Sequence, residues 1–166
     1  MKKICLLRHA KSSWKYPRLD DFERPLNKRG RKNAPFMGQA LREIGYVPDL
    51  IISSPASRAA TTARIVAMAL DYPFEQIEYQ ASIYESGHGN LVHLLSHLDD
   101  QLKKVMLVGH NPALTILANK IGDTPIANLP TSGAYCAAFN TNSWSRIKRK
   151  TGKLQFFEYP KKHVKK

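Results

Sequence analysis

Short apolar runs alternate with longer amphipathic segments along this chain. The runs at residues 4–7, 49–53 and 104–108 are bounded by polar residues, and each has the length of a buried strand. Two later runs, 134–139 and 154–159, flank a turn-rich segment and predict a closing pair of strands. The segments that follow the first three runs carry apolar residues at helical spacing. We therefore expect helices over residues 27–44, 54–70, 90–98 and 111–121, with a short strand near Glu78.

Capping residues support these boundaries. Asn27 can cap the first helix, and Gly45 is suited to end it. Pro55 and Pro112 stand in the first turns of two other helices, where a missing N–H costs nothing. Residues 10–26 are polar and predict a loop.

Strands separated by helices predict an α/β fold. We expect three αβα layers, in which a mostly parallel sheet has helices on both faces and the last two strands add an antiparallel edge. The length of 166 residues suits one domain, placed at residues 1–160 and followed by a basic tail, 161–166.

Polar residues that can bind a phosphate group follow the first three strands. They are Arg8 and His9 after the first, Ser54 and Arg58 after the second, and His110 and Asn111 after the third. Ligands of open α/β sheets bind beyond the carboxyl ends of the strands, so these residues should face one crevice. Guanidinium groups and helix N-termini bind phosphate oxygens, and a neutral imidazole is a nucleophile at pH 7. The set predicts a phosphoryl-transfer site, in which Ser12, Asn111 and Ser132 could also hydrogen-bond phosphate.

The net charge indicates that the partners are anionic but does not distinguish between the kinds of anionic partner. The net charge is +13, and both ends are basic, with +8 over residues 1–33 and +8 over residues 146–166. This balance favours anionic partners, either nucleic acid or phosphorylated substrates. The sequence has no signal peptide and no apolar stretch long enough to span a bilayer, so we expect a cytoplasmic protein without membrane contact. Cys5 and Cys136 lie in apolar runs and are interpreted as buried thiols.

Other polar residues favour structural roles. His93 and His97 have a spacing that could hold a metal, but no third ligand accompanies them and a helix-surface pair is favoured. Arg24 is as readily an ion pair with Asp20 or Asp21 as a phosphate contact. Trp14 and Tyr16 either line the mouth of the crevice or pack the loop.

Four motifs, in this order, resemble the histidine phosphatase superfamily, which is related to phosphoglycerate mutase. They are LLRHAKSSW, ERPLNKRG, IISSPASRAATTA and MLVGHNPAL, and they are similar to small phosphohistidine phosphatases of the SixA type. The similarity extends from residue 3 to about residue 135. Ala10 departs from the usual Arg-His-Gly triplet, and the chain has no long insert of the kind that forms a substrate cap in larger relatives.

The resemblance implies a role for each matched residue. His9 would be the nucleophile, Arg8 and Arg58 phosphate ligands, and His110 a second imidazole at the phosphoryl group, without metal or other cofactor. Glu85, in ASIYESG, is the candidate general acid; a solvated loop carboxylate is the alternative. The expected activity is hydrolysis of phosphohistidine on a protein by a monomeric enzyme. Two alternatives stay open: a small-molecule phosphomonoesterase, and a nucleic-acid-binding module, which the sequence disfavours.

Overall fold

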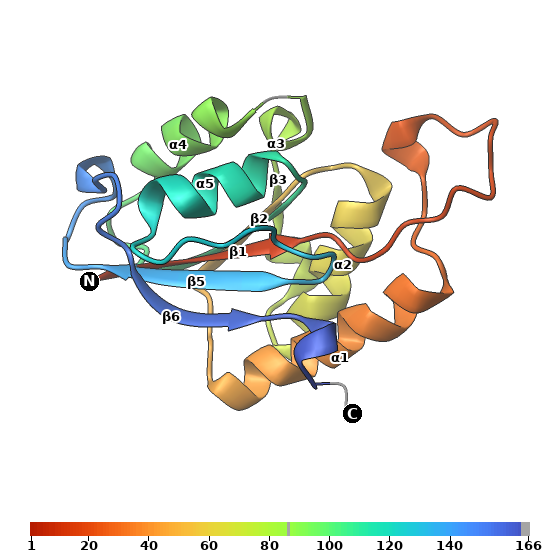
Figure 1. Cartoon of the computed structure of the whole chain (residues 1–166), viewed down its shortest axis with the longest axis horizontal. Coiled ribbons are helices and arrows are strands. Elements are labelled where there is room, and N and C mark those ends of the chain that lie inside the picture. The colour runs from red at the N-terminus through yellow and green to blue at the C-terminus, as the bar shows by residue number, and fades with distance from the viewer. Residues whose placement is uncertain (86, 164–166) are drawn as a thin grey trace.

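A six-stranded sheet forms the centre of the computed structural model, which describes residues 1–85 and 87–163 (Figure 1). The strands lie in the order β3-β2-β4-β1-β5-β6. Their bounds are Lys2–Arg8 for β1, Leu50–Ser53 for β2, Glu78–Tyr79 for β3, Lys104–Gly109 for β4, Ala134–Phe139 for β5 and Lys153–Glu158 for β6. Strands β3, β2, β4 and β1 are parallel, while β5 and β6 pair antiparallel. The predicted parallel sheet with an antiparallel edge is therefore confirmed.

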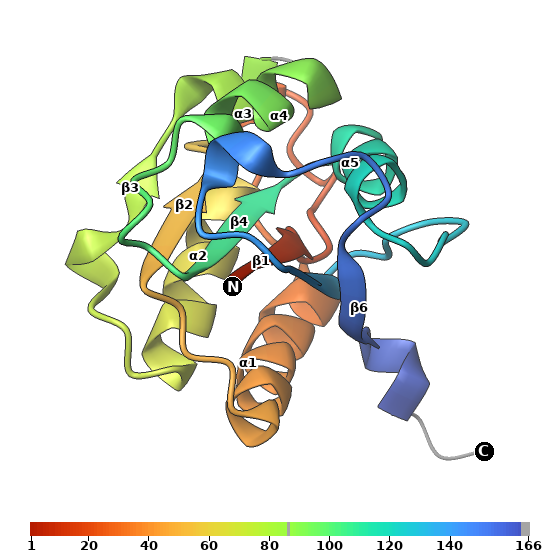
Figure 2. The same cartoon turned by 90° about the vertical axis from the view of Figure 1, so that its left-hand side faces the viewer.

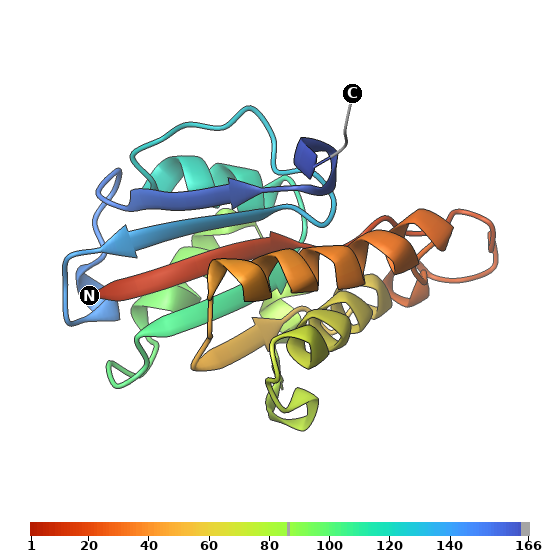
Figure 3. The ribbon, with the colours of Figure 1, turned by 90° about the horizontal axis from the view of Figure 1, so that it is seen from below.

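Helices cover both faces of this sheet, which confirms the three-layer expectation (Figures 2 and 3). Their bounds are Lys28–Ile44 for α1, Ser57–Ala69 for α2, Ala81–Glu85 for α3, His88–Ser96 for α4 and Ala113–Ile121 for α5. Helices α1 and α2 pack together on one face, and α4 and α5 on the other. Alternate residues of the central strands supply two apolar cores, one with Leu6 and Leu107 and one with Cys5 and Met106. The parallel strands are thus buried on both sides, as their continuous apolar runs predict.

Helices α2 and α3 differ most from the prediction, while α4 begins and ends two residues early and α5 begins two residues late. Helix α2 begins at Ser57 rather than at Ser54, because Ala56 is extended and its N–H donates to Ser54 Oγ at 3.2 Å. Helix α3 is absent from the predicted helices, because its five residues are too few to show a period. Helix α1 has the predicted bounds: Asn27 Oδ1 accepts the Gly30 N–H at 2.8 Å, and Gly45 has a φ of 84°.

The remaining segments are short. Residues 10–26 contain the 3-10 helix η1 (Asp21–Glu23) and a bridge between Ser12 and Leu26. Residues 161–163 of the expected tail belong to η4 (Pro160–His163), where Lys162 and His163 pair with Glu158. Residues 164–166 of that tail lie outside the described residues. Two further 3-10 helices are η2 (Phe74–Gln76) and η3 (Trp144–Arg146).

Two other expectations concern cysteines and membranes. Cys5 and Cys136 are buried free thiols, as predicted, and they are cross-strand partners in the β1–β5 register. Within residues 1–85 and 87–163, no helix has the length and apolar character needed to cross a bilayer.

Candidate active site

The candidate site lies where β1, β2 and β4 end. The β1–α1 segment projects beyond this edge of the sheet (Figure 1). Backbone hydrogen bonds continue past the strand ends, from His9 N–H to Gly109 O at 3.1 Å and from Ser54 N–H to Val108 O at 3.0 Å. These bonds hold the three connections side by side. Residues that are up to about 100 positions apart in sequence therefore meet at one place, as the strand-end argument predicts.

His9 is held with one ring nitrogen bonded and the other available. The ring is buried, and its Nδ1–H donates to the Ala10 carbonyl at 2.8 Å, because a carbonyl oxygen can only accept. Ala10 is held on its N-terminal side, since its N–H donates to Thr62 Oγ1 at 2.9 Å. This tautomer leaves a lone pair on Nε2, which is the atom a nucleophilic imidazole uses.

His110 stands beside His9, with ring centroids 5.1 Å apart. Its Nε2 is 2.8 Å from Ser54 Oγ, which also accepts the Ala56 N–H. The Ser54 hydroxyl can donate to Nε2, and in that tautomer the proton of the neutral His110 ring is on Nδ1. That Nδ1 is buried and has no partner in the described part of the chain. In this tautomer it is a hydrogen-bond donor that a ligand can satisfy.

Unpaired polar atoms gather at this one place. In the described residues, the buried side-chain nitrogens and oxygens without a hydrogen-bond partner are Arg8 Nε, Arg58 Nε, His110 Nδ1 and Ser132 Oγ. Ser132 adjoins His9, since its N–H donates to the His9 carbonyl at 3.1 Å. Buried polar groups normally have partners, and leaving one without costs about 1–3 kcal/mol. Four such atoms around one imidazole indicate a site that an anion completes.

Burial and charge keep both imidazoles neutral. Burial lowers the pKa of His9 to about 3, with further lowering by the charges of His110, Arg58 and Arg8; the Ala10 hydrogen bond opposes it. Burial also lowers the pKa of His110 to about 4, helped mainly by Arg58. The neutral form is the nucleophilic one, so the cationic surroundings that attract an anion also keep His9 reactive.

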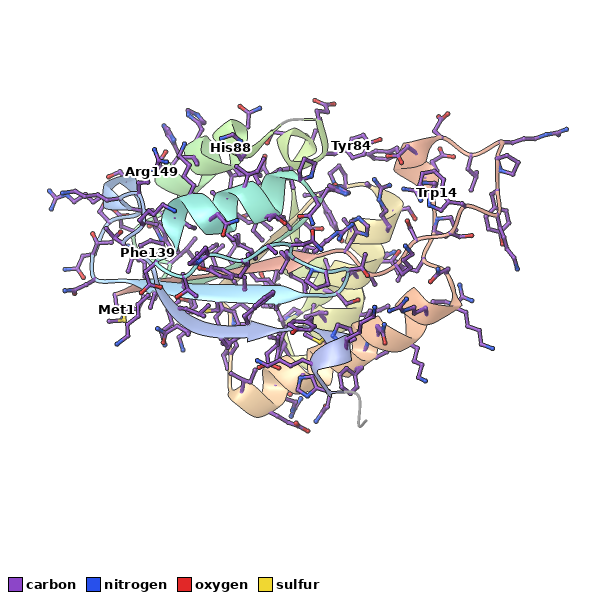
Figure 4. All side chains as sticks on the ribbon, viewed as in Figure 1. Met1, Trp14, Tyr84, His88, Phe139 and Arg149 are labelled. Carbon is purple, nitrogen blue, oxygen red and sulfur yellow. The ribbon has the colours of Figure 1, made fainter. Side chains whose placement is uncertain are left out.

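Asp21 and Tyr84 are contacts of the site that the sequence did not reveal. Arg58 donates to Asp21 Oδ2 at 3.0 Å and to the Asp21 carbonyl at 2.7 Å, and Tyr84 donates to Oδ2 at 2.8 Å. Desolvation would raise the pKa of Asp21, but the bonds from Tyr84 and Arg58 outweigh it and lower this pKa to about 2. Tyr84, which is labelled in Figure 4, also packs edge-on against His110, with centroids 5.6 Å apart. The pairing of Arg24 with Asp20 or Asp21 is resolved in favour of Asp21, at 3.1 Å.

The structure does not bring every predicted residue to the anion site. Glu85 is exposed at the end of α3, and within the described residues no hydrogen bond or ion pair joins it to His9 or His110. Ser12 is buried, but its hydroxyl accepts from Arg24 at 2.7 Å. Asn111 donates to the Leu129 carbonyl at 2.9 Å and accepts from Thr115. The roles assigned to Glu85, Ser12 and Asn111 therefore stay predictions.

Metal binding finds no support in the side chains. No cluster of three or more His, Cys, Asp or Glu residues able to hold a metal occurs within residues 1–85 and 87–163. His93 and His97 stack on exposed helix surface with centroids 4.1 Å apart.

Comparisons with known proteins identify the family and the fold. The family model of the histidine phosphatase superfamily (branch 1) matches residues 4–97, more than half of the chain. A chloroplast protein from Arabidopsis thaliana is 30% identical over 151 residues, which cover 86% of this chain and 69% of the relative. The structure of a protein assigned as phosphohistidine phosphatase SixA from Agrobacterium tumefaciens is 29% identical, with a TM-score of 0.80 and coverage of 96% and 98%. A protein histidine phosphatase SixA complexed with tungstate is 18% identical and shares the fold, with a TM-score of 0.83 and coverage of 98% and 99%.

Proposed function

The chain belongs to the histidine phosphatase superfamily, and from this premise we propose that it hydrolyses phosphohistidine on a protein through a phosphorylated His9. The observation that carries the proposal is the convergence of Arg8, Arg58 and His110, each with an unpaired buried nitrogen, around a neutral His9. A phosphoryl group is the ligand that such a set fits, because its oxygens accept from planar guanidinium groups.

The proposed reaction has two steps. First, His9 Nε2 attacks phosphorus and the phosphorus–nitrogen bond of the substrate breaks. The substrate imidazole, already protonated on its other ring nitrogen, takes the electron pair of the broken bond and leaves as a neutral molecule. Second, water attacks the phosphorylated His9, giving inorganic phosphate and free imidazole. Arg8, Arg58 and the Nδ1–H of His110 stabilise the charge on the equatorial oxygens in both steps. The two guanidinium groups supply the positive charge that a metal supplies in other phosphatases, so we propose a metal-independent reaction.

A protein substrate is favoured because two of the three connections at the site are short; the third, residues 9–27, is the segment that projects beyond the sheet. Only residues 54–56 separate β2 from α2, and only residues 110–112 separate β4 from α5. Neither connection has the length to cover a small ligand. The likeness to proteins assigned as SixA phosphohistidine phosphatases supports the same substrate class.

A turnover screen combined with trapping of the intermediate tests the proposal. Phosphohistidine peptides, aryl phosphates and sugar phosphates are compared in the presence of a chelator, and the enzyme is quenched during turnover. We expect the phosphohistidine peptide to be hydrolysed fastest and an acid-labile phosphate to appear on the protein. His9→Ala should abolish both signals, and His93→Ala, an exposed histidine on α4, should keep them.

Two results would contradict the proposal. Preference for a sugar or aryl phosphate would reassign the chain to a small-molecule phosphomonoesterase. Turnover by folded His9→Ala at the rate of the unchanged chain would remove His9 as the nucleophile.

A further inference from the structure

A large basic pocket lies beside the active site and is not used by the proposed reaction. It has a volume of about 1070 Å³ and is formed by the chain just after β1 and the start of α1. Its cations are Lys11, Lys15, Lys28, Arg29, Arg31 and Lys32. No acidic residue lines it, and none of the ion pairs formed within residues 1–85 and 87–163 involves these six. All six are exposed, so the pocket presents unneutralised positive charge to the solvent.

Several of these cations lie where they destabilise helix α1. Helix α1 begins at Lys28, and its first turn contains no acidic residue. The N-terminal end of a helix carries partial positive charge, so cations there repel it. Stability alone would place Asp or Glu at these positions. A local arrangement that disagrees with stability is typical of a binding site.

The pocket is joined to the active site by a continuous set of contacts. Lys11 follows His9 by two residues, a distance of about 7 Å along extended chain. The Arg24 guanidinium lies 3.6 Å from the centre of the Trp14 ring, which lines the pocket, and its NH2 is 3.1 Å from Asp21 Oδ1. Asp21 in turn binds Arg58 at the phosphoryl site. A substrate polypeptide whose phosphohistidine lies at His9 can therefore continue directly into the pocket.

We propose that this pocket docks an acidic segment of the phosphorylated protein, next to the residue that carries the phosphoryl group. The inference rests on the proposed function, since it names a feature of that function's substrate. The volume of about 1070 Å³ is slightly above the range of about 300–1,000 Å³ for ligand pockets, enough for several side chains. A polypeptide is favoured over a nucleic acid because the substrate of the proposed reaction is a protein, so its acidic residues reach the pocket in the same binding event.

Binding can be measured separately from catalysis. Trp14 is 76% exposed in the pocket, whereas the other tryptophan, Trp144, is 1% exposed, so ligand-induced changes in tryptophan fluorescence report mainly on the pocket. The titrants are an unphosphorylated peptide of histidine flanked by Asp and Glu, the same peptide with Asn and Gln, and a single-stranded oligonucleotide of equal charge. The corresponding phosphohistidine peptides then give the ratio of KM values between the neutral and acidic sequences.

A charge-neutralising pair supplies the variant, and an equal pair elsewhere supplies the control. Lys28→Gln/Lys32→Gln removes two of the pocket's charges; Lys148→Gln/Arg149→Gln removes two exposed charges at the other end of the molecule, where Arg149 is labelled in Figure 4. Because exposed pairs contribute modestly, we expect the pocket variant to weaken acidic-peptide binding and raise its KM about three- to tenfold. The control pair should change neither value, and the acidic preference should shrink as salt rises. Thermal unfolding should find the pocket variant at least as stable as the unchanged chain, since cations at the start of α1 are unfavourable.

The outcomes separate the two proposals. Equal binding of the acidic and neutral peptides, equal losses in both variants, or tighter binding of the oligonucleotide than of the acidic peptide would each overturn the docking proposal. Hydrolysis of both phosphohistidine peptides with equal KM would overturn docking but keep the proposed function. Selective binding of the acidic peptide, lost in the pocket variant but without hydrolysis of either phosphohistidine peptide, would support the pocket and overturn the function.

Discussion

The two buried imidazoles should make the stability of this protein depend on pH in a way that one substitution reveals. An unfolded histidine has a pKa of about 6.5, whereas the folded chain has pKa values of about 3 for His9 and about 4 for His110. Between these pKa values the unfolded state binds more protons than the folded state. The stability that the two neutral rings contribute is therefore fully present above pH 6.5 and is lost as the pH falls towards 3. From pH 6.5 to pH 5, each ring should remove about 1.6 kcal/mol from the free energy of unfolding. His9→Asn should abolish one of these two contributions.

Urea unfolding at several pH values between 5 and 6.5 measures this effect. The His9→Asn and His110→Asn variants should each lose about 1.6 kcal/mol less than the unchanged chain across this window. His93→Asn, at an exposed position of α4, is the matched control and should follow the unchanged chain. Equal losses in the unchanged chain and in His9→Asn would refute the reasoning, because they would mean that burial does not hold His9 neutral.

Three further predictions concern the site and its surroundings. Vanadate should inhibit competitively, because its five-coordinate form resembles in-line phosphoryl transfer, and steady-state kinetics with Arg58→Ala should show weaker inhibition. Glu85→Gln should slow hydrolysis of alkyl phosphates by up to about 10²–10⁴-fold but affect phosphohistidine far less, because a departing alkoxide needs a proton more than an imidazole does; equal losses on both substrates in parallel assays would exclude Glu85 as a general acid. Asn111→Ala should lower the free energy of unfolding by about 1–3 kcal/mol, since its amide links the Leu129 carbonyl to Thr115, and unchanged urea midpoints would contradict this structural role.

Patterns local in sequence explain which features could be predicted. Helix α1 follows from its apolar spacing, Asn27 and Gly45, all of which act within one element. The meeting of Arg8, His9, Arg58 and His110 follows from a rule about where parallel strands end, so it needs no knowledge of side-chain contacts. Both inferences are possible because each uses one kind of information: the pattern within one helix, or the position where parallel strands end.

Features that depend on how loops pack could not be predicted in this way. Asp21 meets Arg58 across 37 positions and Tyr84 across 63, and neither contact leaves a period or a spacing in the sequence. The motif ASIYESG indicates Glu85 as the candidate general acid, whereas the side chain that packs against His110 is that of its neighbour Tyr84. The same limit applies to the basic pocket. The sequence shows an excess of positive charge near the N-terminus, but it does not show that these cations lie apart from the acidic residues.

The hydrogen bond from His9 to the Ala10 carbonyl has a consequence for how this site tolerates mutation. In many enzymes a carboxylate side chain orients the reactive imidazole, and one substitution can delete it. Here the orienting group belongs to the main chain, which every amino acid supplies. Exchange at position 10 therefore changes the orientation of the imidazole only by moving the main chain, which hydrogen bonds from the His9 and Ala10 N–H groups hold just before this carbonyl. A lineage can thus alter the residue after the nucleophile, as Ala10 in place of the superfamily's usual glycine illustrates, while the tautomer of His9 is inherited with the backbone.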